Sequence, residues 1–372
     1  MREKQWVLIF IGLFYWLAHS LTRPLIAVHA QNIGLQEIEI GLIIAIYAIL
    51  PFFLAIPSSK YVQRFGEVRT LRWSAYCMLL SGVCYSFSQG IVVLLLAQMF
   101  AGLGQMGVWM IIQVMVMNPT VRTVEFVANF TFYNTVGQLL GPLAGGVITQ
   151  YVSLQMSFYV YTVISLFVLW LTFKIIEIKG PITIAHVEMK VSLKESLQLF
   201  ENKQFVLMLL FSFMTLFILE ARTTYLPIYL QTIQFSPMEI GVLLTIGAAA
   251  SLLVRPIYKR LYQIFDALTI SVGSFIGAIC LLFFTPQLNS GITLGMLLFI
   301  SGIALGINQP LSLSIIGNEI LSKGHTYAVG LRLMANRLAQ LVGPIIFSVF
   351  IATASLNRAF IYCACLLSLI CL

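Results

Sequence analysis

Charge is what this chain has least of. Asp, Glu, Lys and Arg make up only 9% of its 372 residues, whereas hydrophobic residues make up 60%. A water-soluble domain carries roughly 25% charged residues, and the mean hydropathy here is +0.97. The composition therefore excludes an ordinary soluble protein and indicates one that lies mostly within a membrane.

Residues that hold metals or form disulfides are also scarce. The chain has 6 Cys and 4 His; every Cys falls within an apolar stretch, and no His or Cys spacing matches a metal site. No nucleophile–base pair and no Gly-x4-Gly-Lys-Ser/Thr phosphate-binding motif is present. The sequence therefore predicts no metal, no bound cofactor, no enzymatic activity and no ATP-driven pump.

Long apolar runs take the place of the missing charges. Each is bounded by polar or charged residues, and most are long enough to cross a bilayer as a helix. Twelve such segments lie at about 6–29, 39–58, 70–88, 91–116, 126–149, 154–175, 205–228, 238–256, 267–285, 292–316, 327–353 and 357–372. We therefore expect an all-α membrane protein with 12 transmembrane helices.

The distribution of Lys and Arg between the loops predicts the orientation. With the N-terminus in the cytoplasm, 16 of the 21 Lys and Arg lie in inner loops, and only Arg358 lies in an outer loop. The positive-inside rule then places both termini in the cytoplasm. It also explains the net charge of +8 without a nucleic-acid partner. We expect a multi-pass protein of a bacterial inner (plasma) membrane, surrounded by lipid and working as a monomer.

The two halves of the chain repeat each other. Glu39-Ile40-Gly41 recurs as Glu239-Ile240-Gly241 at an offset of 200. An offset of 202 relates four further pairs: Asn134 and Asn336, Gln138 and Gln340, Gly141 and Gly343, Pro142 and Pro344. A parallel repeat of this kind indicates two related six-helix bundles. The sequence thus predicts an N-terminal bundle over 1–176, a cytoplasmic linker over 177–204 and a C-terminal bundle over 205–372.

Glycine and proline gather in the fifth apolar segment, at Gly137, Gly141, Pro142, Gly145 and Gly146. These are poor helix formers, but glycine lets another helix approach closely within a membrane. Their pattern, Gly-x3-Gly-Pro-x2-Gly-Gly, resembles the fifth-helix signature of drug:proton antiporters in the major facilitator superfamily. That signature is typical of exporters. A helix that simply packs through small residues is the alternative interpretation.

The loop after the second apolar segment resembles another signature of that superfamily, Gly-x3-Asp-Arg-x-Gly-Arg-x-Arg. Arg64, Gly66 and Arg69 fit it, whereas Gln63 stands where the family has Asp. In the family this loop latches the two halves on the cytoplasmic side, so the three matching residues are candidates for gating. The fourth segment departs too, with Gln98 where proton antiporters usually carry Arg.

The resemblance covers nearly the whole chain. It implies the major facilitator fold, with two parallel-related six-helix bundles. It also implies a secondary active exporter of a small molecule, driven by the proton gradient through alternating access. An importer of organic anions with the same fold and a non-transporting membrane sensor are the alternatives.

Ionisable residues at membrane depth cost at least about 2.5–3.5 kcal/mol each, so each is a candidate functional group. The first segment carries Tyr15, His19 and Arg23 at a four-residue spacing, which places them on one helix face. The resemblance implies that this helix lines the central cavity, so the three residues are candidates for binding substrate. The alternative is that Arg23 extends to the outer surface.

The seventh segment contains Glu220 and Arg222. Arg222 lies near the repeat equivalent of Arg23, and the two are candidates for a clamp on carboxylate or phosphate. Glu220 is the carboxylate deep within a helix. It is a candidate for proton coupling, or else the structural partner of an arginine on another helix.

Other candidates for binding substrate are scattered over the fourth, tenth and eleventh segments. They are Trp109, Gln113, Asn308 and Arg337. Arg332, Asn336 and Gln340 share one face of the eleventh segment, and Arg337 lies one residue off that face. Buried arginines thus outnumber Glu220, which favours an anionic or zwitterionic solute, such as an endogenous metallophore or siderophore, over an organic cation. A drug remains the other class of substrate.

Overall fold

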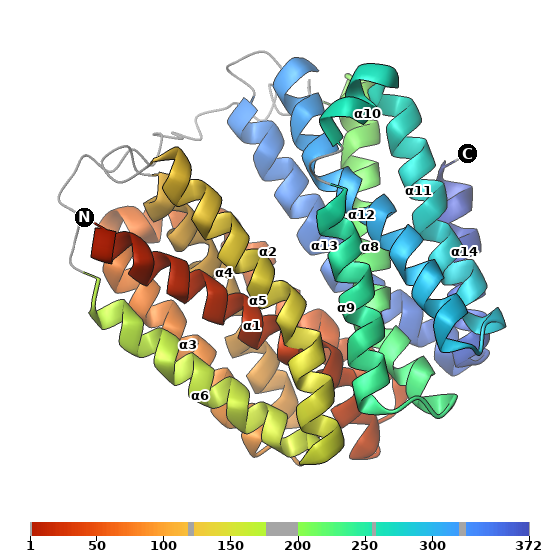
Figure 1. Cartoon of the computed structure of the whole chain (residues 1–372), viewed down its shortest axis with the longest axis horizontal. Coiled ribbons are helices and arrows are strands. Elements are labelled where there is room, and N and C mark those ends of the chain that lie inside the picture. The colour runs from red at the N-terminus through yellow and green to blue at the C-terminus, as the bar shows by residue number, and fades with distance from the viewer. Residues whose placement is uncertain (1, 118–122, 176–199, 255–257, 320–324, 372) are drawn as a thin grey trace. The chain divides into compact units, whose positions relative to one another are not determined.

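The computed structural model describes residues 2–117, 123–175, 200–254, 258–319 and 325–371 (Figure 1). The described residues form helices and no strand, and twelve of these helices have 16 or more residues. Each of the twelve covers one predicted apolar segment, so the prediction of an all-α protein with 12 long helices is confirmed.

The long helices of the first half are α1 (Arg2–Asn32), α2 (Glu37–Phe65), α3 (Glu67–Ser86), α4 (Ile91–Met117), α5 (Val124–Tyr151) and α6 (Leu154–Phe173). Those of the second half are α8 (Lys203–Thr232), α9 (Pro237–Leu253), α11 (Ala267–Phe284), α12 (Gly291–Glu319), α13 (His325–Thr353) and α14 (Leu356–Cys371). A short helix, α10 (Tyr258–Ile264), and a 3-10 turn (Thr285–Gln287) complete the described elements.

Many of these helices can cross a membrane by length and composition. Among the described residues seven meet that criterion, within α1, α2, α4, α6, α8, α11 and α13, and three shorter apolar helices lie within α9, α12 and α14. Large apolar side chains such as Phe53, Val92 and Val163 are exposed on them. An exterior of this kind suits lipid and would be unfavourable in water.

The chain divides into two compact units, residues 1–186 with 234–242, and residues 187–233 with 243–372. In the first unit α1 packs against α5 and α6, α3 against α4 and α6, and α2 against α4. In the second, α8 packs against α13 and α12, and α11 against α12 and α14. The predicted linker over 177–204, including its surface helix, lies largely outside the described residues, so the predicted bundle boundaries stay a prediction.

The repeat builds the same loop in both halves. Gly34, which follows α1, has a φ of 82°, and Gln234, its equivalent after α8, has a φ of 69°. Glu39 and Glu239 then each accept a hydrogen bond from the backbone N–H three residues earlier, at 2.7 and 2.8 Å. A carboxylate there caps the following helix and is favoured by its dipole. The shared sequence thus encodes a turn followed by a capped helix.

Helix α5 approaches α1 through the glycines of the fifth segment. A Cβ at Gly141 would lie 2.5 Å from the Cβ of Ser20, and one at Gly145 would lie 2.7 Å from the carbonyl oxygen of Leu21. A Cβ at Gly137 would also collide with the backbone of α1. These contacts leave no room for a side chain, so the three glycines allow close packing of α5 on α1.

Candidate functional site

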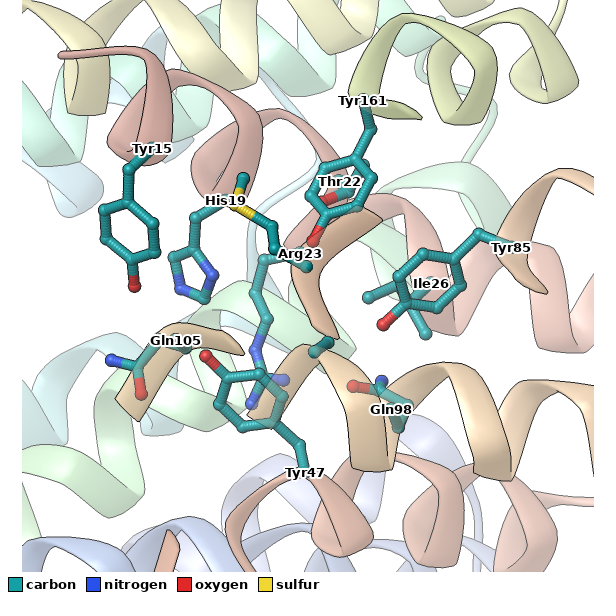
Figure 2. Close-up of a pocket in the computed structure, with 12 residues that line it drawn as sticks. Tyr15, His19, Thr22, Arg23, Ile26, Tyr47, Tyr85, Gln98, Gln105 and Tyr161 are labelled. Carbon is teal, nitrogen blue, oxygen red and sulfur yellow. The ribbon is translucent and has the colours of Figure 1, made fainter. Parts of the chain in front are cut away.

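A polar cavity lies inside the first unit, among α1, α2, α3, α4 and α6 (Figure 2). It contains about 340 Å³ that no protein atom occupies, part of it open to the surroundings. The lining residues are Tyr15, His19, Thr22, Arg23, Ile26, Tyr47, Met78, Tyr85, Gln98, Ala101, Gln105 and Tyr161. So many polar side chains facing one space within a helical bundle define it as the candidate site.

The face of α1 predicted from the four-residue spacing lines this cavity. Tyr15, His19 and Arg23 all belong to its lining, in three successive turns of α1. The rings of Tyr15 and His19 are stacked with their centroids 6.0 Å apart. The structure therefore brings together three side chains that the sequence predicted to lie on one helix face.

Arg23 supplies the positive charge of the cavity. Its side chain is 6% exposed, so it does not extend to the surface. The guanidinium carbon lies 4.2 Å from the centroid of the Tyr47 ring, a cation–π contact across α1 and α2. Among the described residues no Asp or Glu lines the cavity. The site therefore favours anionic groups.

Trp109 contacts the α1 face that carries Tyr15, His19 and Arg23, but it does not line the cavity. Its ring is stacked on Tyr15 at 6.1 Å between centroids and meets Trp16 edge-on at 5.0 Å. Gln113, one turn further along α4, is exposed and does not line the cavity either. The substrate-binding role predicted for these two residues stays a prediction.

Several lining residues were not predicted as site residues. Tyr47, Tyr85 and Tyr161 come from three different helices, and single tyrosines in apolar segments gave no signal of a shared cavity. Gln98 was noted only as a departure from a family pattern. It is fully buried, and neither its amide oxygen nor its amide nitrogen has a hydrogen-bond partner among the described residues.

The second unit holds Glu220 in a chain of hydrogen bonds that joins α8 to α13. The Gln340 amide nitrogen donates to Glu220 at 2.9 Å, and the Gln340 amide oxygen accepts from the Arg337 guanidinium at 2.8 Å. Glu220 is 5% exposed. A glutamine therefore bridges the buried carboxylate and an arginine on the neighbouring helix.

Other polar contacts join the same two helices. Ser212 donates to the amide oxygen of Asn336 at 2.8 Å, and the Tyr225 hydroxyl donates to the carbonyl oxygen of Pro344 at 2.6 Å. The amides of the predicted polar face of α13 thus bond across to α8, as interhelical amides commonly do in membranes.

Arg222 lies in α8 within the second unit and is 7% exposed. Its Nε and Nη1 atoms have no hydrogen-bond partner among the described residues. Gly247 in α9 is close to it, since a Cβ there would lie 3.1 Å from Nη1. The predicted clamp between Arg222 and Arg23 stays a prediction.

The remaining predicted residues fall into two groups. Gly66 joins α2 to α3 with a φ of 84°, a conformation that glycine adopts without strain, and Arg64 and Arg69 beside it are exposed. Their gating role stays a prediction. Asn308 lies in α12, but its side chain is outside the described part of the chain, as are those of the residues that follow it to 330.

The described residues also include no group of three His, Cys, Asp or Glu side chains placed to hold a metal ion. Long apolar helices around a buried polar cavity define a multi-pass membrane protein that handles a polar molecule. The model of the Major Facilitator Superfamily matches residues 8–344, and the chain belongs to this superfamily.

The chain is similar to several transporters along nearly its full length. It is 20% identical over 353 residues to an uncharacterised MFS-type transporter of Methanocaldococcus jannaschii, a match that covers 93% of the chain and 90% of the relative. A solved nucleoside transporter superposes with a TM-score of 0.83 at 12% identity, covering 99% of this chain and 97% of the other. A D-xylose–proton symporter superposes with a TM-score of 0.70 at 16% identity, covering 98% and 96%.

Membership of this family has direct consequences for the predictions. The chain is a membrane transporter for a small molecule and not an enzyme, and transporters of this family use ion gradients without a bound cofactor. The alternative of a non-transporting sensor is therefore wrong. The likeness to the solved structures shows the fold, and it leaves the solute, the direction of transport and the coupling ion to be proposed.

Proposed function

We propose that this transporter is a secondary active exporter of a small anionic or zwitterionic solute, driven by the proton gradient through alternating access. An endogenous metallophore or siderophore is the proposed solute, and a drug is the second candidate. The observation that carries this proposal is the buried guanidinium of Arg23 in a cavity whose described lining contains no acidic side chain.

Charge decides between classes of solute. Bringing an organic cation beside Arg23 would add like-charge repulsion to the cost of leaving water, whereas a carboxylate would form charge-assisted hydrogen bonds. Arg222 is the second proposed anion-binding side chain, because two of its guanidinium nitrogens are buried without a protein partner among the described residues. Each of these two arginines, taken by itself, favours a carboxylate on the solute.

Different observations support export and proton coupling. Export is supported by the resemblance of Gly137, Gly141, Pro142, Gly145 and Gly146 to the signature of antiporters. The proposed orientation, with both termini in the cytoplasm, follows from the 16 basic residues of the inner loops.

Glu220 is the proposed proton carrier. Protonation would change the hydrogen-bonding role of Glu220 toward Gln340, because a neutral carboxyl can donate a hydrogen bond whereas the carboxylate can only accept one. Loss or gain of that proton would therefore alter the contact between α8 and α13.

The proposal is tested by comparing metabolites inside and outside cells with and without the protein, under metal limitation and in rich medium. We expect an anionic metabolite to accumulate inside cells that lack the protein, and re-expression of the protein to release it. If no metabolite differs in either medium, export of an endogenous solute is wrong, and a foreign drug or import becomes the better explanation.

A further inference from the structure

Two polar side chains in the cavity of the first unit lack the partners that buried polar groups normally have. Gln98 in α4 is fully buried and Tyr85 in α3 is 1% exposed. Both amide atoms of Gln98 and the hydroxyl of Tyr85 are without a hydrogen-bond partner among the described residues. Such groups are costly to bury, so their presence calls for an explanation.

Both groups face the same space as Arg23. All three line one cavity, and Figure 2 shows the Gln98 amide and the Tyr85 hydroxyl turned toward the side on which the Arg23 side chain enters. By contrast, the hydroxyl of Tyr161, another lining residue, bonds to Ser81 at 2.9 Å. The unpaired hydrogen-bonding capacity is therefore concentrated around Gln98 and Tyr85, near a cation.

The hydrogen-bonding chemistry of Gln98 restricts the ligand. Its amide nitrogen donates only and its amide oxygen accepts only. A simple anion such as chloride or acetate could use the donor and would leave the oxygen unsatisfied. A ligand that satisfies both atoms beside Arg23 must carry a negative group and, next to it, a hydrogen-bond donor.

For the ligand group that donates to the Gln98 amide oxygen, a hydroxyl suits this cavity better than an ammonium group does. Arg23 already supplies positive charge, and no acidic side chain among the described lining residues would balance a second cation. A hydroxyl donates its one hydrogen to the Gln98 oxygen without that repulsion and can accept a hydrogen bond from the Tyr85 hydroxyl.

We propose that Gln98 and Tyr85, with Arg23, form a recognition site for an α-hydroxycarboxylate, the end group by which the transported solute is recognised. Arg23 binds the carboxylate, Gln98 pairs with both the carboxylate and the hydroxyl, and Tyr85 completes the contacts. This inference rests on the proposed anionic solute and makes it specific. It does not depend on the direction of transport.

Glycolate, acetate and glycine are matched probes, because they differ only in carrying a hydroxyl, a hydrogen or an ammonium group beside the carboxylate. The measurement is the thermal unfolding of the purified full chain in detergent, titrated with each compound, since a ligand that binds the native state raises the midpoint. We expect glycolate to raise the midpoint at concentrations several-fold below those needed for acetate or glycine.

The variants Gln98→Leu and Tyr85→Phe separate recognition from folding. Each removes a polar group without a protein partner, so unliganded protein should unfold at the wild-type temperature or above it. Gln98→Leu should abolish the preference for glycolate over acetate, and Tyr85→Phe should weaken glycolate binding several-fold. Gln150→Leu, an exposed position on α5, is the matched control and should behave as wild type.

Equal binding of glycolate and acetate, stronger binding of glycine, no stabilisation by any of the three, or an unchanged preference in Gln98→Leu would each overturn the inference. These outcomes are separate from failure of the proposed function. Cells that retain an anion without the protein, combined with no glycolate preference, would leave export standing and remove only the hydroxyl assignment. Glycolate preference without any retained metabolite would leave the hydroxyl assignment standing and remove only the export of an endogenous solute.

Discussion

Two buried charges in this transporter are accommodated in different ways. Arg23 lies against the ring of Tyr47 in a cavity with uncharged polar groups, whereas Glu220 is held by Gln340, which also accepts from Arg337. A cation over an aromatic ring is stabilised by electrostatic attraction to the face of that ring. A carboxylate within a chain of hydrogen bonds is instead tied to the packing of two helices.

The first prediction concerns Arg23. Arg23→Gln should lower transport about 10- to 100-fold, because a hydrogen bond to a charged group contributes about 1.5–3 kcal/mol. The amount of protein in the membrane should not change, since glutamine is also polar and smaller. Release of the retained anion from cells measures transport, and Arg358→Gln, an exposed position near the start of α14, is the control. Normal transport by Arg23→Gln would rule out its binding role.

The second prediction concerns Gln340. Gln340→Leu should lower the free energy of unfolding by about 1–3 kcal/mol, because Glu220 and Arg337 each lose a buried partner. Denaturant unfolding of the purified protein in detergent measures this loss. Gln150→Leu makes the same chemical change at an exposed site and should shift stability by less than about 0.5 kcal/mol. Equal shifts in the two variants would show that the bridge does not stabilise the fold.

The sequence predicted part of the candidate site and missed the rest for a physical reason. Tyr15, His19 and Arg23 follow a helical spacing within one segment, so one helix is enough to place them on a common face. Tyr47, Tyr85 and Gln98 join them only through the packing of α2, α3 and α4. Such contacts depend on the rotation of each helix, and weak amphipathic patterns in apolar helices do not specify it.

Pairs of helices related by the repeat pack by different means. Asn134, Gly141 and Pro142 in α5 recur as Asn336, Gly343 and Pro344 in α13. Helix α5 meets α1 through backbone contacts at its glycines, whereas α13 accepts hydrogen bonds from α8 at Asn336 and Pro344. The repeated residues therefore lie at both helix pairs, and they meet different partner residues on α1 and on α8.

The third prediction concerns the glycines of α5. Gly141→Ala should lower the free energy of unfolding by about 1–3 kcal/mol, because the new Cβ has no room against Ser20 and Leu21 of α1. Gly273→Ala in α11 is the matched control, since a Cβ there meets nothing within 4 Å. That control should gain about 0.5–1 kcal/mol from helix propensity. Stabilisation by both substitutions would contradict the close packing of α5 on α1.

The fourth prediction concerns the loop after α8. Gln234 has a φ of 69° where its repeat equivalent is glycine. Because this conformation is unfavourable for residues with a Cβ, Gln234→Gly should raise the free energy of unfolding by about 0.5–1 kcal/mol. Gln234→Ala keeps the Cβ and should give no such gain. The same unfolding measurement decides, and identical values for the two variants would show that the loop is not strained.

At the level of helices the sequence was a good guide. The apolar runs and their boundaries follow from the need to bury about 20 residues per crossing, and the capped starts of α2 and α9 follow from Glu39 and Glu239. The short helix α10 was not predicted, because seven residues between two apolar segments carry too little periodicity to be recognised.

For the whole molecule, the family is established and the solute and direction are proposed. The repeat, the fold and the matched family model agree on a major facilitator transporter. Composition alone predicted the membrane, because a chain with 9% charged residues has no soluble alternative. The direction of transport could not follow from composition or fold, since importers and exporters share both.

The most direct test of anion export uses membrane vesicles from cells that make the protein, with the anion that accumulates in cells lacking it. Inside-out vesicles with an acidic interior should take up this anion, and a protonophore, Arg23→Gln or Glu220→Gln should each abolish uptake. Uptake only by right-side-out vesicles, or uptake unaffected by the proton gradient, would contradict a proton-coupled exporter.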